Sequence, residues 1–473
     1  SFERTGKFIR YFNLENFEIL NVNEILISFV TLSRLLYKQF SKNVIILVDN
    51  YDTFLNNLIK NPVNESDEIL NVLSSLEGQL LKYNPYLHKG FVGGVHRVSR
   101  LGMMPNLKNF SDFSFQIDSK FSKYFGFSSE EVDFLISKKS QFKSLKHVKS
   151  IIDEFYGGYS VGGRQMYNTW SVTRYFRQTH TPWAYISRGQ MSSLFGTTMC
   201  IPNVFRVIQL LINGDIYSLN QTNWLTADQI LAINDLVRHK NVNNKNLNLF
   251  VSILYNLGYL TDKDKHTQTH GGVEVKVPNA EIASSLLREI LECGLKGKHS
   301  EKDLFMLRKS LDSFVPFTVT KEKFQFFRSS LYNFFNNSDR FPTTVEEVKR
   351  TLFVHCFEKY FLRKNFMLQL KDNDEATYLE KENLIFINEY RVSVEIKVSF
   401  CQNGEFTKTE MDACAIDAHD VLYKENKNVF IEDSFDVAGR VYIGFAFHTN
   451  KRITIACSSH TKSRGDYLNA TLL

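Results

Sequence analysis

Residues 44–48 are all apolar, and the polar residues that follow them have types that could support phosphate chemistry. Asp49 stands at the carboxyl end of the expected strand, where parallel sheets place metal-bound phosphates, so its carboxylate could orient a magnesium ion. Hydrolysis also needs a basic oxygen that accepts a proton from the attacking water. Asn50 occupies the next position and has no such oxygen. The segment is interpreted as a nucleotide site without its base, on a strand expected to be buried on both faces.

A second set of candidates lies near the C-terminus. Glu395 and Lys397 share one face of an expected strand, where the carboxylate could bind a divalent metal and the ammonium could steady the attacking water. A hairpin turning around residue 389 would place Asn383 opposite Glu395, but an amide oxygen without charge weakens magnesium binding. The alternative for Glu395 and Lys397 is an ordinary ion pair on a half-exposed sheet.

The sequence gives little support for zinc binding, redox chemistry, a histidine metal site or a phosphate loop. The six cysteines never form a Cys-x-x-Cys pair, which argues against zinc and redox motifs and favours reduced, buried thiols. His266 and His270 share a polar loop with Asp262 and Asp264, and this set is interpreted as solvated rather than metal-binding. No phosphate loop of the form Gly-x-x-x-x-Gly-Lys-Ser/Thr occurs.

The length and the charge distribution of the chain limit the number of domains and the kinds of partner to expect. A chain of 473 residues exceeds what one core usually supports, so two or three domains are expected. Residues 1–300 hold 33 basic and 26 acidic residues, whereas residues 301–473 hold 24 and 25. Any nucleic-acid contact is therefore expected in the first 300 residues. The abundant Phe and Tyr are attributed to an AT-rich coding sequence rather than to base stacking. No apolar stretch long enough for a membrane span occurs, so an intracellular location without membrane contact is expected.

Apolar periodicity divides the chain into three expected domains, residues 1–190, 191–300 and 301–473. In the first, strands at 8–12, 44–49 and 90–98 alternate with helices at 22–40 and 67–82, which predicts a parallel sheet. The second is helical, ends one helix at Gly258 and has a hairpin near Gly271-Gly272, which predicts either a winged-helix module or a plain helical linker. The third has helices at 303–314 and 345–361, strands at 383–388 and 391–398, a helix at 409–424 and strands at 441–448 and 452–456. It is a second α/β domain with a loose tail after Ser458.

Several motifs in this order resemble those of the AAA-ATPase-like proteins fused to a C-terminal PD-(D/E)XK nuclease-like domain. The segments that carry the resemblance are Asp49-Asn50-Tyr51-Asp52, Gly93-Gly94-Val95-His96-Arg97, Phe125 to Val132, Tyr156-Gly157-Gly158-Tyr159, Tyr167-Asn168-Thr169-Trp170-Ser171, Leu257 to Thr261, Val277-Pro278-Asn279-Ala280-Glu281, and Glu395-Ile396-Lys397.

The resemblance implies roles for individual residues. Asp49, Asn50, Asp52 and Arg97 correspond to nucleotide-binding positions, although Asn50 replaces a glutamate and Gly93 a sensor threonine. The family's phosphate loop would precede Ser1. In the nuclease-like domain Asn383 takes the position of the family's Asp, while Asp417 and Tyr423 match its Gln-x5-Tyr element with Gln replaced by acid. The resemblance thereby makes Asp417 a candidate metal ligand beside Glu395. Both sites are thus degenerate relative to the family.

The leading hypothesis is a pseudoenzyme that acts as an intracellular binding or scaffolding protein. Its partner is an unidentified protein or nucleic acid, and no cofactor is expected unless a site is active, in which case magnesium and ATP are the candidates. The first alternative is a magnesium-dependent DNA endonuclease with a relaxed metal site. The second is a DNA-binding module that uses residues 190–300.

Overall fold

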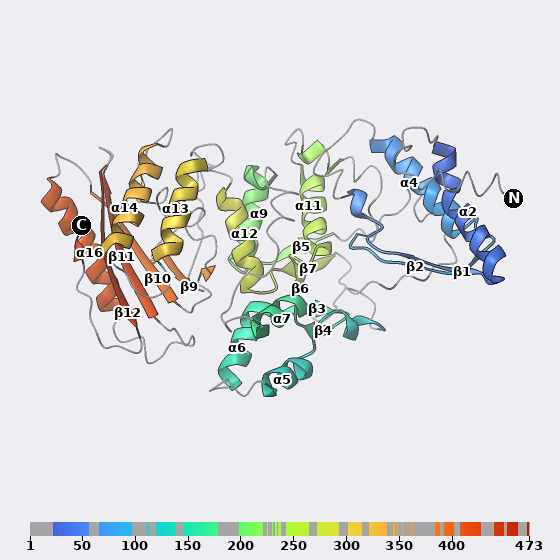
Figure 1. The fold of residues 1–473 in the computed structure, drawn as a ribbon, viewed down its shortest axis with the longest axis horizontal. Coiled ribbons are helices and arrows are strands. Elements are labelled where there is room, and N and C mark those ends of the chain that lie inside the picture. The colour runs from blue at the N-terminus through green and yellow to red at the C-terminus, as the bar shows by residue number, and fades with distance from the viewer. Residues whose placement is uncertain are drawn as a thin grey trace.

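The computed structural model describes residues 22–55, 66–96, 111, 113, 120–138, 145–177, 198–220, 225, 229, 232–233, 235–237, 243–263, 272–292, 301–314, 321–337, 344–345, 348, 352, 361–362, 384–387, 392–401, 407–426, 439–448, 452–461 and 471–472. It is a mixed α/β structure with helices and several sheets. Residues 22–96 lie at one end of its longest axis and the largest sheet lies at the other (Figure 1).

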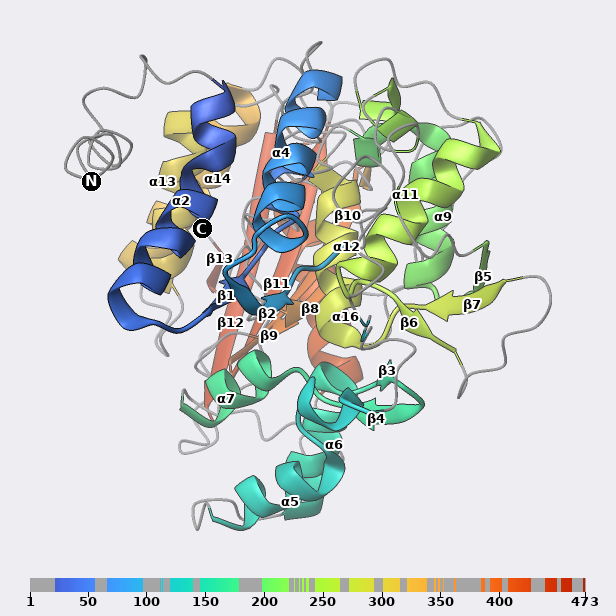
Figure 2. The same ribbon diagram turned by 90° about the vertical axis from the view of Figure 1, so that its right-hand side faces the viewer.

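The N-terminal part contains two parallel strands and two helices. The elements are α2 (Val22–Phe40), β1 (Val44–Val48), α4 (Ser66–Leu81) and β2 (Leu87–Val92). β1 pairs with β2 so that Leu47 lies opposite Phe91, and α2 packs against α4 and β1 (Figure 2). The expectation that β1 is buried on both faces is wrong, because Leu47 is 74% exposed and Ile45 and Phe91 share that exposed face. An apolar run is compatible with one covered face or two.

The next part has a helical core of its own. Its elements are η2 (Ser122–Tyr124), α5 (Ser129–Ser137), α6 (Leu145–Tyr156), β3 (Tyr159–Val161), β4 (Arg164–Met166) and α7 (Thr169–Arg177). Apolar side chains from α5, α6 and α7 form one buried cluster. An isolated antiparallel bridge between Phe127 and Tyr167 joins the segment before α5 to the segment before α7.

The middle of the chain combines helices with a small antiparallel sheet in the order β5-β7-β6. Its elements are η3 (Thr198–Cys200), α9 (Pro202–Ile212), β5 (Tyr217–Leu219), α11 (Asn244–Asn256), β6 (Thr261–Asp262), β7 (Val273–Lys276) and α12 (Ala280–Glu292). Gly258 has a φ of +81°, and the amide of Tyr259 bonds the carbonyl of Leu254, so the predicted glycine end of α11 is confirmed.

A six-stranded sheet dominates the C-terminal part, in the order β13-β12-β11-β10-β9-β8. Its strands are β8 (Phe361–Leu362), β9 (Leu384–Ile387), β10 (Val392–Phe400), β11 (Gly439–His448), β12 (Arg452–Thr461) and β13 (Thr471–Leu472), and its helices are α13 (Glu301–Phe314), α14 (Lys321–Asn336) and α16 (Lys408–Asn426). β10 and β11 are parallel, and the other neighbouring strands are antiparallel.

The two faces of this sheet differ in chemistry. One face presents apolar residues such as Ile396 and Phe445, which pack with aromatic residues of α14. Met411 and Ala415 of α16 pack against alanines on the other face. Helix α14 was not expected from the sequence, and the loose tail expected after Ser458 is wrong, because β12 continues to Thr461 and β13 pairs with it.

Candidate functional site

The end of β1 brings together Asp49 and the loop after β2. Asp49 and Asn50 are both exposed, and Asn50 adopts a left-handed φ of +53°. A Cβ added at Gly93 would lie 3.8 Å from Asp49 Oδ1, so these two positions lie side by side. Arg97 lies outside the described residues. The geometry leaves Asp49 accessible to a ligand, and the next residue, Asn50, supplies no basic oxygen.

Asp52 points inward and holds the loop rather than a ligand. Its Oδ2 accepts hydrogen bonds from the backbone amides of Val95 (3.0 Å) and His96 (2.6 Å). The hydroxyl of Tyr51 donates to the carbonyl of His96. A Cβ at Gly94 would come within 2.5 Å of the Tyr51 ring, so only glycine fits there. Asp52 is therefore a structural carboxylate that fastens the β2 loop to the turn after β1.

His96 is buried beside this carboxylate. Neither ring nitrogen has a hydrogen-bond partner among the residues that the structure describes. Burial lowers the pKa of His96 to about 4, although the negative charge of Asp52 opposes that shift. The imidazole is therefore neutral at physiological pH.

Three motifs singled out from the sequence converge where α7 meets α12. Glu281 is fully buried, and both of its carboxylate oxygens accept from Ser171 Oγ, at 3.0 and 2.8 Å. The side chain of Asn279 donates to the carbonyl of Gly157 (2.8 Å) and accepts from the amide of Ile282 (3.1 Å). A Cβ at Gly158 would lie 2.1 Å from the carbonyl oxygen of Pro278. These motifs act here as a structural junction between distant segments.

Burial also affects a tyrosine at this junction. It raises the pKa of Tyr159, and the nearby charge of Glu281 raises it further. Tyr159 therefore stays protonated and can donate a hydrogen bond at any physiological pH.

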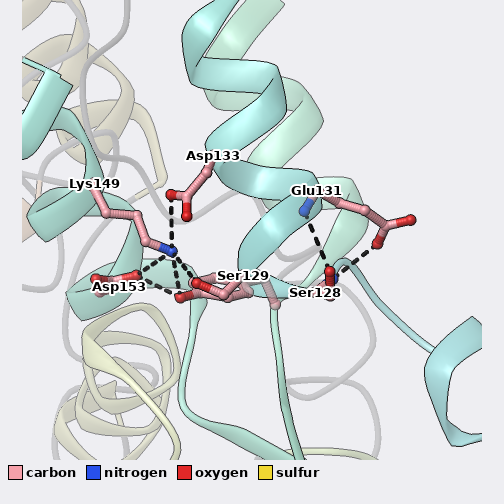
Figure 3. Close-up of polar contacts among 7 residues, drawn as sticks. Ser128, Ser129, Glu131, Asp133, Lys149 and Asp153 are labelled. Carbon is pink, nitrogen blue, oxygen red and sulfur yellow. Dashed lines mark hydrogen bonds and ion pairs between the residues drawn. The ribbon is translucent and has the colours of Figure 1, made fainter.

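The motif at the start of α5 forms a helix cap and a lysine cluster (Figure 3). Ser128 and Glu131 make reciprocal side-chain to backbone bonds, which is a capping box. Lys149 Nζ lies 2.8 Å from Ser129 Oγ, 3.2 Å from Asp153 and 3.5 Å from Asp133.

A serine beside a lysine could in principle act as a nucleophile and its base. Burial lowers the pKa of Lys149, but hydrogen bonds with Tyr167 and Asp153 outweigh burial and leave the pKa above its ordinary value. The lysine is therefore protonated and cannot accept the proton of Ser129. The cluster joins α5 to α6 and does not provide a base.

In the C-terminal sheet, Glu395 pairs with a residue that the sequence reasoning missed. Arg440 on β11 donates from Nη1 to Glu395 Oε1 at 3.0 Å, and the two side chains are 1% and 0% exposed. Ion pairs of this kind are buried only when the charges compensate each other. The signal in the sequence was a single arginine directly before the apolar run 441–447. The carboxylate proposed as a metal ligand is thus bound to an internal cation.

Aromatic residues surround this ion pair. Tyr442 is the register partner of Glu395, and burial, followed by the charge of Glu395, raises the pKa of Tyr442 to about 12. The Tyr423 ring lies edge-on to Tyr442, with centroids 5.9 Å apart. Tyr423, which the resemblance singled out, therefore does reach the neighbourhood of Glu395.

A Ser-His-Asp chain lies on the same side of the sheet. His419 Nε2 is 2.7 Å from Ser458 Oγ, and its Nδ1 is 3.1 Å from Asp420 Oδ1. His419 of α16 and Ser458 of β12 are both buried. A nucleophilic serine must be reached by its substrate, so this chain is interpreted as a satisfied polar contact between α16 and β12.

The remaining candidates are placed as follows. Lys397 is half-buried on the same strand face as Glu395, whereas Asp417 lies on the exposed side of α16, away from the residues that face the sheet. Glu395 pairs with Ile385, so the hairpin register differs by two residues from the one that would set Asn383 opposite Glu395. Asn383 itself lies outside the described residues. The structure therefore does not bring Asp417 to Glu395.

The part of the chain that the structure describes contains neither a clustered metal site nor a helix that could span a membrane. There, no three His, Cys, Asp or Glu side chains gather as a metal site. His266, His270 and Asp264 fall outside it, and Asp262 is buried and accepts from the hydroxyl of Tyr255 at 2.5 Å. No described helix is long and apolar enough to cross a membrane.

Comparison with known proteins identifies one similarity. Residues 4–104 match the model of a family described as predicted AAA-ATPase. This stretch contains β1, β2 and the loop with Asp52 and His96. No curated protein and no solved structure matches the chain. The N-terminal part is therefore similar to an AAA-ATPase-like family.

Proposed function

We propose that the protein is a pseudoenzyme built from an AAA-ATPase-like domain, a winged-helix-like middle and a PD-(D/E)XK nuclease-like domain, and that it acts as an intracellular binding or scaffolding protein. The observation that carries the proposal is the buried pair of Glu395 and Arg440. A metal ion would have to displace this guanidinium, and breaking a buried pair costs about 3–5 kcal/mol.

The topology supports the proposed domains. In the C-terminal part, the order β9, β10, α16, β11 follows the strand, strand, helix, strand order expected from the sequence, with Glu395 and Lys397 on a central strand. In the middle, the strand order β5-β7-β6 beside α9 and α11 supports a winged-helix-like module.

The N-terminal site supports loss of ATP hydrolysis. Asp49 is exposed and has Asn50 where a base is needed, and Asp52 is engaged by two backbone amides. An exposed carboxylate alone neither holds phosphates nor activates water. ATP and magnesium are therefore not expected to act as cofactors here.

A cleavage assay tests the proposal. Supercoiled plasmid and single-stranded DNA are incubated with the protein in Mg²⁺ and in Mn²⁺, beside Lys397→Ala as the matched control. We expect equal, background-level cleavage from the two proteins. Cleavage by the wild type that is lost in Lys397→Ala would refute the pseudoenzyme and favour the magnesium-dependent endonuclease.

The burial of α11 argues against the alternative function, a DNA-binding module in residues 190–300. In a winged helix this helix would read DNA, yet seven consecutive residues, Leu249–Tyr255, are buried. Within α11 only Asn244 and Lys245 are exposed, and Asn246 in the same turn is buried. The geometry disfavours α11 as a recognition helix, so a nucleic-acid contact must be sought elsewhere.

A further inference from the structure

Three exposed aromatic side chains lie near the bridge between Phe127 and Tyr167. Tyr124 is 70% exposed, Phe125 49% and Trp170 56%. The bridge makes both of its backbone hydrogen bonds, at 3.1 and 2.9 Å. Because Tyr124 and Trp170 are each three residues from the bridge, their backbones lie within about 11 Å of it. We call Tyr124, Phe125 and Trp170 the aromatic platform.

Cations accompany these rings. Lys123 Nζ lies 4.9 Å from the centre of the Tyr124 ring, and the Arg174 guanidinium lies 4.4 Å from that of Trp170. Lys120 lies 5.3 Å from the Phe121 ring. Residues 120–127 and 164–177 together contain five Lys or Arg residues and no Asp or Glu. The platform is therefore flanked by positive charge from both of its segments.

Exposed aromatic rings beside cations are suited to a ligand that carries both flat rings and negative charges. We propose that the aromatic platform binds single-stranded nucleic acid, with bases stacked on Tyr124 and Trp170 and phosphates close to the flanking cations. Base stacking on aromatic side chains is worth roughly 1–3 kcal/mol per base and tolerates any sequence. A duplex offers the same phosphates, but its bases are stacked on each other and cannot reach the rings.

Carboxylates also lie near the bridge: Asp153 of α6 accepts from the hydroxyl of Tyr167 at 2.6 Å, and Glu130 lies in the first turn of α5. Hydrogen bonds with Ser128 and the backbone, followed by the positive charges of Lys149 and Arg164, hold the pKa of Glu130 below its ordinary value. Glu130 is exposed, so its charge also repels an approaching phosphate. The Glu130→Gln variant is therefore expected to bind single strands more tightly than the wild type.

The test measures fluorescence anisotropy of a labelled oligothymidine in EDTA, where no metal-dependent cleavage can interfere. We expect Tyr124→Ala and Trp170→Ala each to weaken binding about tenfold, and Trp170→Phe to retain most of it. The matched control is Tyr83→Ala, because Tyr83 is 59% exposed and carries Lys82 at 5.0 Å but lies outside the platform. That control should bind as the wild type does.

The salt dependence of the affinity and the effect of unlabelled competitors distinguish binding at the platform from general electrostatic attraction. Arg174→Gln should reduce the slope of log affinity against log salt concentration. Unlabelled duplex and polyglutamate should compete poorly. No binding, equal binding by Trp170→Ala and the wild type, or full competition by polyglutamate would overturn the proposal.

The platform rests on the proposed binding role, for which it names single-stranded nucleic acid as the partner. Lys397-dependent cleavage would refute the pseudoenzyme and leave the platform intact. Absence of binding in EDTA would remove the platform and leave the assignment of Glu395 and Arg440 unchanged.

Discussion

Replacing Arg440 by Met tests the central assignment directly. Arg440 Nη1 lies 3.0 Å from Glu395 Oε1, and both side chains are almost fully buried. The Arg440→Met variant leaves a carboxylate buried without its cation, which costs about 3–5 kcal/mol. We therefore expect the free energy of opening of β10 and β11 to fall by that amount. The double variant with Glu395→Leu removes both charges and should recover most of the loss, because an apolar pair of similar volume is often neutral.

Native-state hydrogen exchange of peptides from β10 and β11 measures this effect locally, which matters because a chain with several domains does not unfold in one step. Arg440→Met should exchange about a hundredfold to several thousandfold faster than the wild type, and the double variant should return close to it. A loss below about 1 kcal/mol would mean that the pair behaves like an exposed one. Increased protection of wild-type β10 on addition of Mg²⁺ would likewise refute the reasoning, since it would show that Glu395 binds metal.

Three further predictions concern other parts of the fold. Burial holds the folded-state pKa of His96 at about 4, below its ordinary value of 6.5, so the stabilising contribution is present above pH 6.5 and is lost as the pH falls towards 4. Hydrogen exchange of β2 should therefore show a loss of up to about 3 kcal/mol that is absent in His96→Leu. Gly158→Ala should lower the melting temperature more than Gly163→Ala, since both have positive φ but only the former would clash with Pro278; equal losses would contradict this. Gly444→Ala should destabilise the C-terminal sheet by about 1–3 kcal/mol, because a Cβ there would lie 2.0 Å from a carbonyl of α16, and unchanged urea unfolding would argue against that contact.

Local patterns predicted many elements because periodicity and end signals are local. The expected helix at residues 22–40 is α2 with the same bounds, and Gly258 ends α11 as expected. Helix α14 was missed although Phe324, Phe327 and Leu331 have helical spacing and are buried. The exposed face of β1 could not be predicted, since the elements that cover a strand come from elsewhere in the chain.

The candidate sites were harder to predict because partners distant in sequence define them. Glu395 and Arg440 are 45 positions apart and meet only because β10 and β11 are parallel neighbours. A small shift in the centre of the hairpin moved the residue opposite Glu395 from the expected Asn383 to Ile385. Sequence reasoning found the acid but not its cation, since strand register is a property of the assembled sheet.

Asp52 and Glu395, one acid at each candidate site, have internal partners, and this explains how such acids can persist without catalysis. Asp52 accepts two backbone amides, and Glu395 accepts the guanidinium of Arg440. Removing either carboxylate would leave buried donors without a partner, at a cost of about 1–3 kcal/mol for each neutral donor and more for a charged one. Selection for stability alone would therefore retain both acids. Asn50 is exposed and adopts a left-handed φ of +53°, a conformation that asparagine tolerates better than glutamate does.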